Sequence, residues 1–297
     1  MTKKLFCVLL AALLSLCAFV SCETSEGDSQ GSNGENTSGI GEQAQLPLIS
    51  ELDITFSGNK ISASQSSSAI EINENVLTIK SGGKYTLTGE LDGGRIIVNA
   101  PKTEKVELIL FGINISCSDN APIYVKSCDK VKIILEKGTI NTLTDGVKYD
   151  LPSGEDKPNA CLYSSEDIDI EGEGTLIVNA NYNNGIASKN DIDIESGRIE
   201  ISAKNNAIKG RDSVSILGGE VIITASDDGI KSDNDEDTSK GYVSIEGGKI
   251  EINATDDAIQ ACSSVSLTGG TVITAAEGKA INCDGNITLS EGVLTEN

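Results

Sequence analysis

The chain has 297 residues, with 45 Asp and Glu against 23 Lys and Arg, a net charge of -22, and neither His nor Trp. This charge argues against nucleic-acid binding, which depends on Lys and Arg that neutralise phosphates. Because His is the commonest metal ligand and is missing here, any bound metal is expected to be a hard cation held by oxygen atoms.

Residues 1–21 are predicted to be an export signal of the lipoprotein type. Two lysines precede an apolar stretch from Leu5 to Val20, and Phe19-Val20-Ser21-Cys22 follows. The stretch fits a signal peptide rather than a membrane span, and its end resembles a bacterial lipobox in which Phe replaces the usual Leu. We expect Cys22 to be lipidated, so that the lipid alone holds an exported protein at the bacterial membrane, on the cell surface or in the periplasm. The alternative is ordinary secretion with cleavage nearby.

Residues 22–45 are polar and rich in Ser, Gly and Glu. Such a segment has too few apolar residues to form a core, so it is predicted to be a disordered tether. From Leu46 onward, short apolar alternations such as Ile70-Glu71-Ile72 are separated by Gly, Asn and Asp, which predicts strands. No helical periodicity appears after the signal. The expected fold class is therefore all-β, over residues 46–297.

An internal repeat decides the architecture. Residues 186–207, 208–229 and 259–280 align without gaps at 22 residues, and residues 230–258 are the same unit with 7 extra residues. Residues 123–146 and 161–185 are looser copies. A propeller blade needs a repeat of about 40 residues or more, calcium-binding nonapeptide solenoids need a Gly-Gly-x-Gly-x-Asp period, and a β-sandwich would not show ungapped copies.

Each unit contains three short strands, which in residues 208–229 are Ile208–Gly210, Val214–Ile216 and Val221–Ala225. Alternate strand residues point the same way and stay apolar or small in every copy. We therefore predict a right-handed parallel β-helix, a solenoid of about 22 residues and three short strands per coil, because parallel crossovers are nearly always right-handed. Five cysteines in this region are odd in number and irregularly spaced, which favours buried free thiols over a disulfide framework: Cys117, Cys128, Cys161, Cys262 and Cys283.

Stacking would bring the last turn of each repeat into register with the next. This turn carries Asn183-Asn184, Asn205-Asn206, Asp227-Asp228, Asp256-Asp257 and Glu277. Stacked Asn side chains stabilise one another by hydrogen bonds, whereas two carboxylates about 5 Å apart repel by roughly 1 kcal/mol in water. Either some of these carboxylates stay protonated or a cation lies between them, and ligands of oxygen alone suit calcium.

The 7-residue insertion adds a second acidic cluster, Asp233-Asn234-Asp235-Glu236-Asp237, four residues after Gly229. Two acidic clusters on one coil strengthen the expectation of calcium. The alternative is that these are solvated turn residues, since Asp and Asn are common in turns. The predicted metal ligands are Asp227, Asp228, Asp233, Asp235, Asp237, Asp256 and Asp257.

Basic residues lie beside the acidic turns. Lys209 and Lys231 occupy the same position in adjacent repeats, with Arg211 and Lys189 nearby. One interpretation is charge balance with the aspartates. The other is recognition of a sugar carboxylate bridged by calcium, with Tyr182 adding an apolar contact. The predicted carbohydrate-binding residues are therefore Lys189, Lys209, Arg211, Lys231 and Tyr182.

Three segments carry a resemblance to a known family: residues 121–126 (APIYVK), 185–189 (GIASK) and 229–237 (GIKSDNDED). They are similar to the bacterial carbohydrate-binding parallel β-helix family, a former domain of unknown function whose fold is similar to pectate and other polysaccharide lyases. The resemblance covers roughly Leu46 to the end. It implies a right-handed β-helix, bound calcium, and binding to cellulose or to acidic polysaccharides such as pectin, without established catalysis.

The leading hypothesis is a non-catalytic, calcium-dependent polysaccharide-binding protein at the bacterial cell surface, expected to be a monomer. A second hypothesis is a polysaccharide lyase that cleaves uronate polymers by β-elimination, with Lys209, Arg211 or Lys231 as the base. A third is a structural surface protein or adhesin, whose solenoid acts as a rigid spacer.

Overall fold

The computed structural model describes residues 51–151 and 157–297, which form strands joined by turns and loops. The predicted signal peptide, the tether at 22–45 and the lipidation site Cys22 lie outside the described residues. Within these two ranges, no helix has the length and apolar character needed to cross a membrane.

Among the described residues, ten strands form one sheet, with parallel pairing everywhere except between β3 (Ile70–Asn73) and β4 (Val76–Ile79). In spatial order they are β26 (Ile281–Cys283), β23 (Ile259–Ala261), β20 (Ile230–Ser232), β17 (Ile208–Gly210), β14 (Asn184–Ser188), β11 (Ala160–Ser164), β8 (Ile123–Ser127), β6 (Arg95–Asn99), β4 (Val76–Ile79) and β3 (Ile70–Asn73).

Eighteen further strands form the rest of the solenoid wall. They are β1 (Glu51–Gly58), β2 (Lys60–Ala63), β5 (Gly83–Asp92), β7 (Val106–Cys117), β9 (Lys130–Leu135), β10 (Ile140–Asp145), β12 (Asp167–Gly172), β13 (Thr175–Ala180), β15 (Asp191–Ile194), β16 (Arg198–Ala203), β18 (Ser213–Ile216), β19 (Glu220–Ala225), β21 (Tyr242–Ile245), β22 (Lys249–Ala254), β24 (Ser264–Leu267), β25 (Thr271–Ala276), β27 (Asn286–Leu289) and β28 (Leu294–Glu296).

The long strand β7 shows why these eighteen strands make two faces rather than one. Its first half, from Val106, pairs with β9, and its second half, from Asn114, pairs with β10. Gly112 lies between the halves with a φ of 73°, a conformation that favours glycine. The buried side chain of Asn141 accepts hydrogen bonds from the amides of Gly112 and Ile113, at 2.9 and 3.1 Å. In later coils the chain is divided at this corner into two separate strands.

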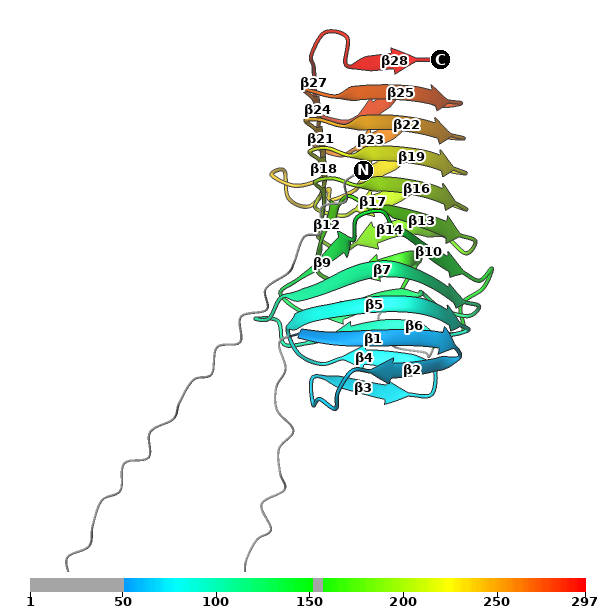
Figure 1. Ribbon diagram of the computed structural model, residues 1–297. Helices are drawn as coiled ribbons and strands as arrows, with labels where there is room; N and C mark the ends of the chain where they lie inside the picture. Colours follow the sequence, from blue (N-terminus) through cyan, green and yellow to red (C-terminus); the bar gives the residue numbers. More distant parts are fainter. Residues whose placement is uncertain (1–50, 152–156) are drawn as a thin grey trace, which may run out of the picture. The chain divides into compact units, whose positions relative to one another are not determined.

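Each coil therefore contributes one strand to each of three faces, and strands stack in register along the axis (Figure 1). Ile186 pairs with Ile208, and Ile208 pairs with Ile230, a period of 22 residues that also separates the hydrogen-bonded Asn184 and Asn206. The predicted parallel β-helix, its coil length and its three strands per coil are confirmed. Its right-handed sense stays a prediction.

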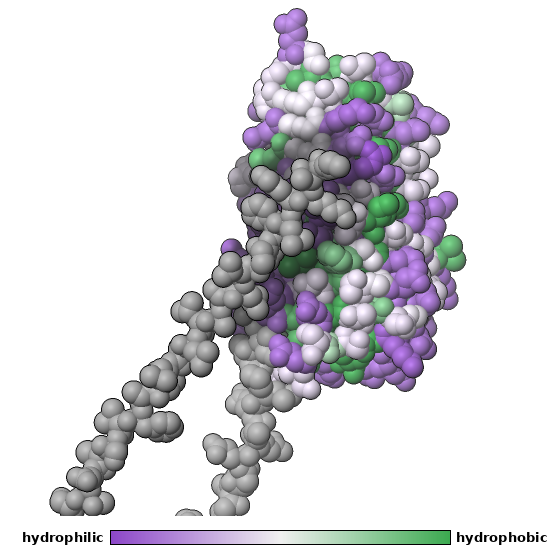
Figure 2. Space-filling model, in the orientation of Figure 1, coloured by the Kyte–Doolittle hydropathy of each residue, from purple (hydrophilic) through white to green (hydrophobic). Residues whose placement is uncertain are grey.

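The core consists of the side chains that the repeat places on alternate strand positions. In the coil of residues 208–229 five of these side chains are at most 1% exposed, and Ala225 is 4% exposed; the five are Ile208, Val214, Ile216, Val221 and Ile223. The neighbouring coils repeat the pattern, so that Ile223 lies between Ile201 and Ile252. The interior is thus lined by aliphatic ladders, while hydrophilic residues cover much of the face that Figure 2 shows.

The glycine pairs of the repeat have a specific role at one turn. Gly219 and Gly248 stack in adjacent coils with φ values of 88° and 87°. A Cβ atom on Gly248 would lie 2.7 Å from the carbonyl oxygen of Gly219. A side chain there would therefore clash with the coil below, which explains why the Gly-Gly motif recurs.

The first coil differs from the prediction of uniformly parallel strands. β1 pairs with β2 and β3 pairs with β4 in antiparallel fashion. These two hairpins lie at the edge of the described solenoid, where an unpaired parallel strand would otherwise expose its hydrogen-bonding groups. The five cysteines are free thiols: Cys117, Cys128 and Cys161 are buried, and Cys262 and Cys283 are partly buried.

Candidate functional site

Stacked asparagines and aspartates occupy the turns at the start of β14, β17, β20 and β23 in the ten-stranded sheet. The side-chain amide of Asn205 donates to Oδ1 of Asn183 at 2.7 Å, and the side chain of Asn206 contacts Oδ1 of Asn184 at 3.0 Å. The next coils continue the ladder with aspartates, where the amide of Asp256 donates to the carbonyl oxygen of Asp227 at 3.2 Å. The predicted register of the turns is therefore present.

Three aspartates of this ladder form one carboxylate group. Asp227, Asp228 and Asp256 each offer an oxygen, and these oxygens all lie within 4.8 Å of one another. Asp228 is 2% exposed, Asp227 is partly buried and Asp256 is exposed. The group therefore opens to solvent at Asp256 and ends at a buried carboxylate, an arrangement in which oxygen is the only ligand type.

The fourth predicted ligand of the ladder, Asp257, has other partners. Its carboxylate accepts hydrogen bonds from the amide of Lys279 at 2.8 Å and from the side chain of Asn282 at 2.6 Å. Its own amide donates to Oδ1 of Asp228 at 3.1 Å. Asp257 thus links the carboxylate group to the following coil and is not one of its three members.

The three carboxylates of this group repel one another, and a lysine relieves part of this repulsion. Burial raises the pKa of Asp227, and the neighbouring charge of Asp228 raises it further. The ammonium of Lys231 lies 2.8 Å from Oδ2 of Asp228. Burial lowers the pKa of Lys231, but the hydrogen bond to Asp228 and the charges of Asp228, Asp227 and Asp233 together outweigh burial, so that the net pKa is raised. One ammonium therefore neutralises part of a group that carries three carboxylates.

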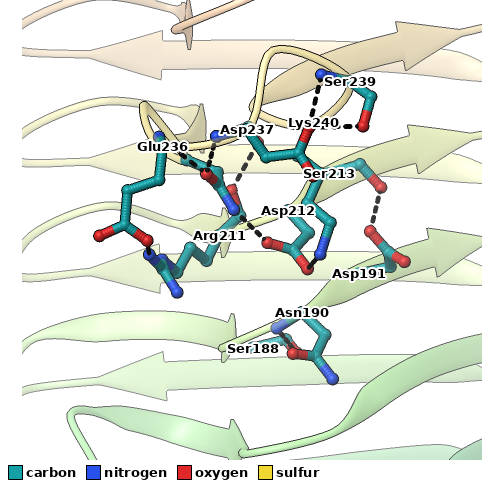
Figure 3. Close-up of polar contacts among 12 residues, drawn as sticks. Ser188, Asn190, Asp191, Arg211, Asp212, Ser213, Glu236, Asp237, Ser239 and Lys240 are labelled. Atoms are coloured by element: carbon teal, nitrogen blue, oxygen red, sulfur yellow. Dashed lines mark hydrogen bonds and ion pairs between the residues drawn. The ribbon is translucent and has the colours of Figure 1, made fainter.

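The acidic insertion folds back on the basic residues of the preceding coil. Asp233 forms an ion pair with Lys209 at 2.7 Å, and Glu236 forms one with Arg211 at 2.5 Å. Asp237 accepts hydrogen bonds from the amide and hydroxyl of Ser239 (Figure 3). Neither Asp233, Asp235 nor Asp237 belongs to the group around Asp227 among the described residues.

Asp212 anchors the same insertion from the coil below. Its carboxylate accepts hydrogen bonds from the side-chain amide of Asn234 at 2.6 Å and from the ammonium of Lys240 at 2.7 Å. Figure 3 shows Lys240 reaching down to Asp212, next to the Ser213–Asp191 hydrogen bond of the adjacent strands. Sequence reasoning missed Asp212, because nothing in the repeat distinguishes it from an ordinary turn residue.

Two of the predicted sugar-binding cations, Lys209 and Lys231, lie beside the carboxylate group. Lys209 and Lys231 pair in register on β17 and β20, with their side chains 27% and 21% exposed. Arg211 is 45% exposed, and Lys189 is exposed directly after β14. The ion pairs of Lys209, Arg211 and Lys231 agree with charge balance, and sugar contact by these residues stays a prediction.

Tyr182 lies in a second, external hydrophobic cluster rather than on an open surface. Its ring stacks on Tyr149, with centroids 4.1 Å apart and planes 19° apart. The cluster also contains Tyr124 and Tyr163, whose rings are 5.8 Å apart on β8 and β11. Tyr124 and Tyr163 alternate with core residues along β8 and β11, a pattern from which an outward aromatic patch could have been predicted. One face of Tyr182 is therefore covered by Tyr149.

Comparison with known proteins gives the family. The model of the family described as carbohydrate-binding domain-containing protein matches residues 73–296. A carbohydrate-binding domain-containing protein of Acetivibrio thermocellus is 42% identical over 151 residues, which are 50% of this chain and 52% of the relative, so this chain matches about half the length of that curated relative.

A solved structure agrees with this assignment. The polysaccharide lyase-like protein from C. thermocellum, solved as a gadolinium derivative, is 43% identical with a TM-score of 0.81, over 83% of this chain and 100% of that chain. Coil stacking, turn ladder and family match lead to the same result: the chain belongs to the carbohydrate-binding domain family and has the parallel β-helix fold of a polysaccharide lyase-like protein.

Proposed function

We propose that this protein binds polysaccharide without cleaving it, in a calcium-dependent manner, along the edge that carries Asp227, Asp228 and Asp256. The observation that carries the proposal is the set of three carboxylate oxygens within 4.8 Å of one another. Calcium takes six to eight oxygen ligands, whereas these residues supply only part of that number. Sugar oxygens and water would complete the shell, which couples calcium to the glycan.

Lys231 would link the binding of calcium to the binding of glycan. Calcium bound at Asp228 would compete with the ammonium that now lies 2.8 Å from its Oδ2. Displaced from Asp228, the Lys231 side chain stays at an outward position beside Lys209. Both ammonium groups would then face a sugar carboxylate, so acidic polysaccharides such as pectin are the preferred ligands and cellulose the neutral comparison. Gadolinium, present in the related structure, is likewise a hard cation.

Calorimetry with oligogalacturonate and cello-oligosaccharide, each with calcium or with a chelator, tests the proposal. The wild-type protein is expected to bind at least one of them, and to bind oligogalacturonate only with calcium. The Asp227→Asn/Asp256→Asn variant should lose this binding. Asp92→Asn, which neutralises an exposed carboxylate on β5, is the matched control and should bind as wild type does. Absence of binding to both glycans with calcium present would refute the proposal.

The lyase alternative requires a base with a lowered pKa. Burial lowers the pKa of Lys231, but its hydrogen bond to Asp228 and the nearby carboxylate charges raise it overall. The hydrogen bond to Glu236 raises the pKa of Arg211, and Lys209 is held in an ion pair with Asp233. These contacts weigh against β-elimination at this edge. An absorbance assay for unsaturated uronate product decides the matter, and product that disappears in Lys231→Ala would favour the lyase. A purely structural spacer predicts that calcium changes stability while no glycan binds.

For localisation, we propose export and anchoring through lipidated Cys22 at the bacterial membrane. The support is the apolar stretch followed by the lipobox-like Phe19-Val20-Ser21-Cys22. Growth with a labelled fatty acid should label the wild-type protein in the membrane fraction and leave Cys22→Ser unlabelled. Equal labelling of the two proteins would exclude this anchor.

A further inference from the structure

A cavity lies on the outer face of the ten-stranded sheet, toward the end that β3 and β4 form. It has a volume of about 260 Å³ and is lined by three cationic side chains, Arg95, Lys126 and Lys157, with no Asp or Glu among the described residues that line it. Its strand β8 is four strands from β20, about 19 Å at 4.8 Å per strand. In a chain with a net charge of -22, three cations with no carboxylate among the described residues around them form an unusual local environment.

The fold constructs this cavity from three adjacent strands. Ile96 and Val98 of β6 point into the core, so Arg95, Ile97 and Asn99 point outward. Ile97 pairs with Thr78 on β4 and with Tyr124 on β8, and all three line the cavity. The cavity floor is therefore the outer surface of the sheet itself, which is a rigid element.

A β-bulge lies at the position of Lys126. The pairing of β6 with β8 runs from Val98–Val125 directly to Asn99–Ser127, so Lys126 is the extra residue. Bulges redirect side chains and are frequent beside binding sites. Here the bulged residue is itself one of the three cations that line the cavity.

The cations lack partners in the described part of the chain. No ion pair joins Arg95, Lys126 or Lys157 to a carboxylate within residues 51–151 and 157–297. The Nε atom of Arg95 is buried without a hydrogen-bond acceptor. Several other cations of the solenoid are paired, such as Lys130 with Asp169 at 2.9 Å. A buried donor without an acceptor is destabilising, so an anionic ligand would satisfy this site.

The remaining lining indicates what else the ligand contains. Ile97, Tyr124, Leu151 and Pro158 supply apolar surface, while Thr78, Asn99 and Asn120 supply amide and hydroxyl groups. Pockets for drug-sized ligands have volumes of roughly 300–1,000 Å³, so this cavity suits a smaller molecule. An apolar wall, amide groups and cations together match a sugar ring with one anionic substituent better than a bare anion.

We propose that this cavity binds one anionic monosaccharide unit, with a carboxylate, sulfate or phosphate substituent, independently of calcium. The site goes beyond the proposed function, because it shares no residue with the carboxylate group and needs no metal. Arg95, Lys126 and Lys157 hold the anionic substituent, and the sugar ring lies against Tyr124 and Ile97.

Titrations followed by NMR in a chelator test the proposal, with glucuronate, glucose 6-sulfate, glucose 6-phosphate, glucose and inorganic phosphate as probes. At least one anionic sugar is expected to bind at least tenfold more tightly than glucose and than inorganic phosphate. Which of the three binds best identifies the substituent. Binding should persist in Asp227→Asn/Asp256→Asn, so failure of the calcium site and failure of this cavity are distinguishable.

Exposed cations make suitable variants because their removal leaves the core intact. Lys126→Met/Lys157→Met should weaken the best anionic sugar at least tenfold, whereas Lys204→Met, which removes an exposed lysine after β16, should leave it unchanged. The proposal is overturned if no anionic sugar binds, if glucose or inorganic phosphate binds as tightly, or if the double variant binds like wild type while its spectrum remains folded.

Discussion

Asp227→Asn should change the stability of this protein in opposite directions without and with calcium. The carboxylate oxygens of Asp227, Asp228 and Asp256 lie within 4.8 Å of one another. Two unit charges at that distance repel by about 0.9 kcal/mol at the dielectric constant of water and about 3.5 kcal/mol at an effective value of 20. Because Asp227 and Asp256 reach solvent, the lower figure applies, and Lys231 offsets part of it.

In a chelator, we expect Asp227→Asn to raise the free energy of unfolding by about 1 kcal/mol, because it removes repulsion and keeps the shape of the side chain. With calcium at 100 times its Kd, wild type should gain about 2.7 kcal/mol, whereas a variant with tenfold weaker affinity should gain about 1.4 kcal/mol. When calcium is added, the higher free energy of unfolding of the variant therefore falls to that of the wild type or below it.

Urea unfolding followed by circular dichroism, with calcium or chelator, measures both effects. At an m-value of about 2–3 kcal/mol/M, 1 kcal/mol moves the midpoint by about 0.3–0.5 M. Asp92→Asn serves as the control for loss of an exposed carboxylate and should respond to calcium as wild type does. A wild-type midpoint that calcium leaves unchanged, or an Asp227→Asn variant less stable than wild type in chelator, would refute the reasoning.

Three further predictions follow from other contacts. The Lys231→Met variant should bind calcium at least about fivefold more tightly, since it lacks the cation that competes for Asp228. It should also bind acidic glycan more weakly. Calorimetry with calcium and then with oligogalacturonate measures both changes in affinity. Ile223→Ala should cost about 2–5 kcal/mol, because this core side chain is 1% exposed, while Ile222→Ala on the outward side of the same strand should cost below about 1 kcal/mol; equal costs in urea unfolding would contradict the strand's orientation. Burial and the nearby charge of Glu104 raise the pKa of Tyr85 from 10.0 to about 12. Since the pKa in the folded state is the higher one, the stability that the neutral tyrosine contributes is complete below pH 10 and is lost as the pH rises to about 12. An unfolding midpoint of the wild-type protein that stays constant over that interval would show that Tyr85 has the same pKa in the folded and unfolded states.

The period of the sequence determined the fold. Ungapped copies of 22 residues fix which side chains face inward, so the core positions from Ile208 to Ala225 could be assigned before any coordinates were known. The same period determined the turn ladder, because parallel stacking brings equivalent residues into register. The meeting of Asp227 with Asp256 follows from that register alone, although the register cannot say that Asp257 turns to Asn282 instead.

Only the tertiary structure decided the partners of residues outside the repeat. The insertion has no copy in other coils, so the pairing of Asp233 with Lys209 depends on how this loop folds back across the coil. The cover of Tyr182 by Tyr149 likewise arises from an irregular loop. The cationic cavity joins Arg95 to Lys157 through three-dimensional folding. Periodic backbone hydrogen bonding fixes neighbours for repeating residues, whereas side chains on irregular segments find theirs only in the folded chain.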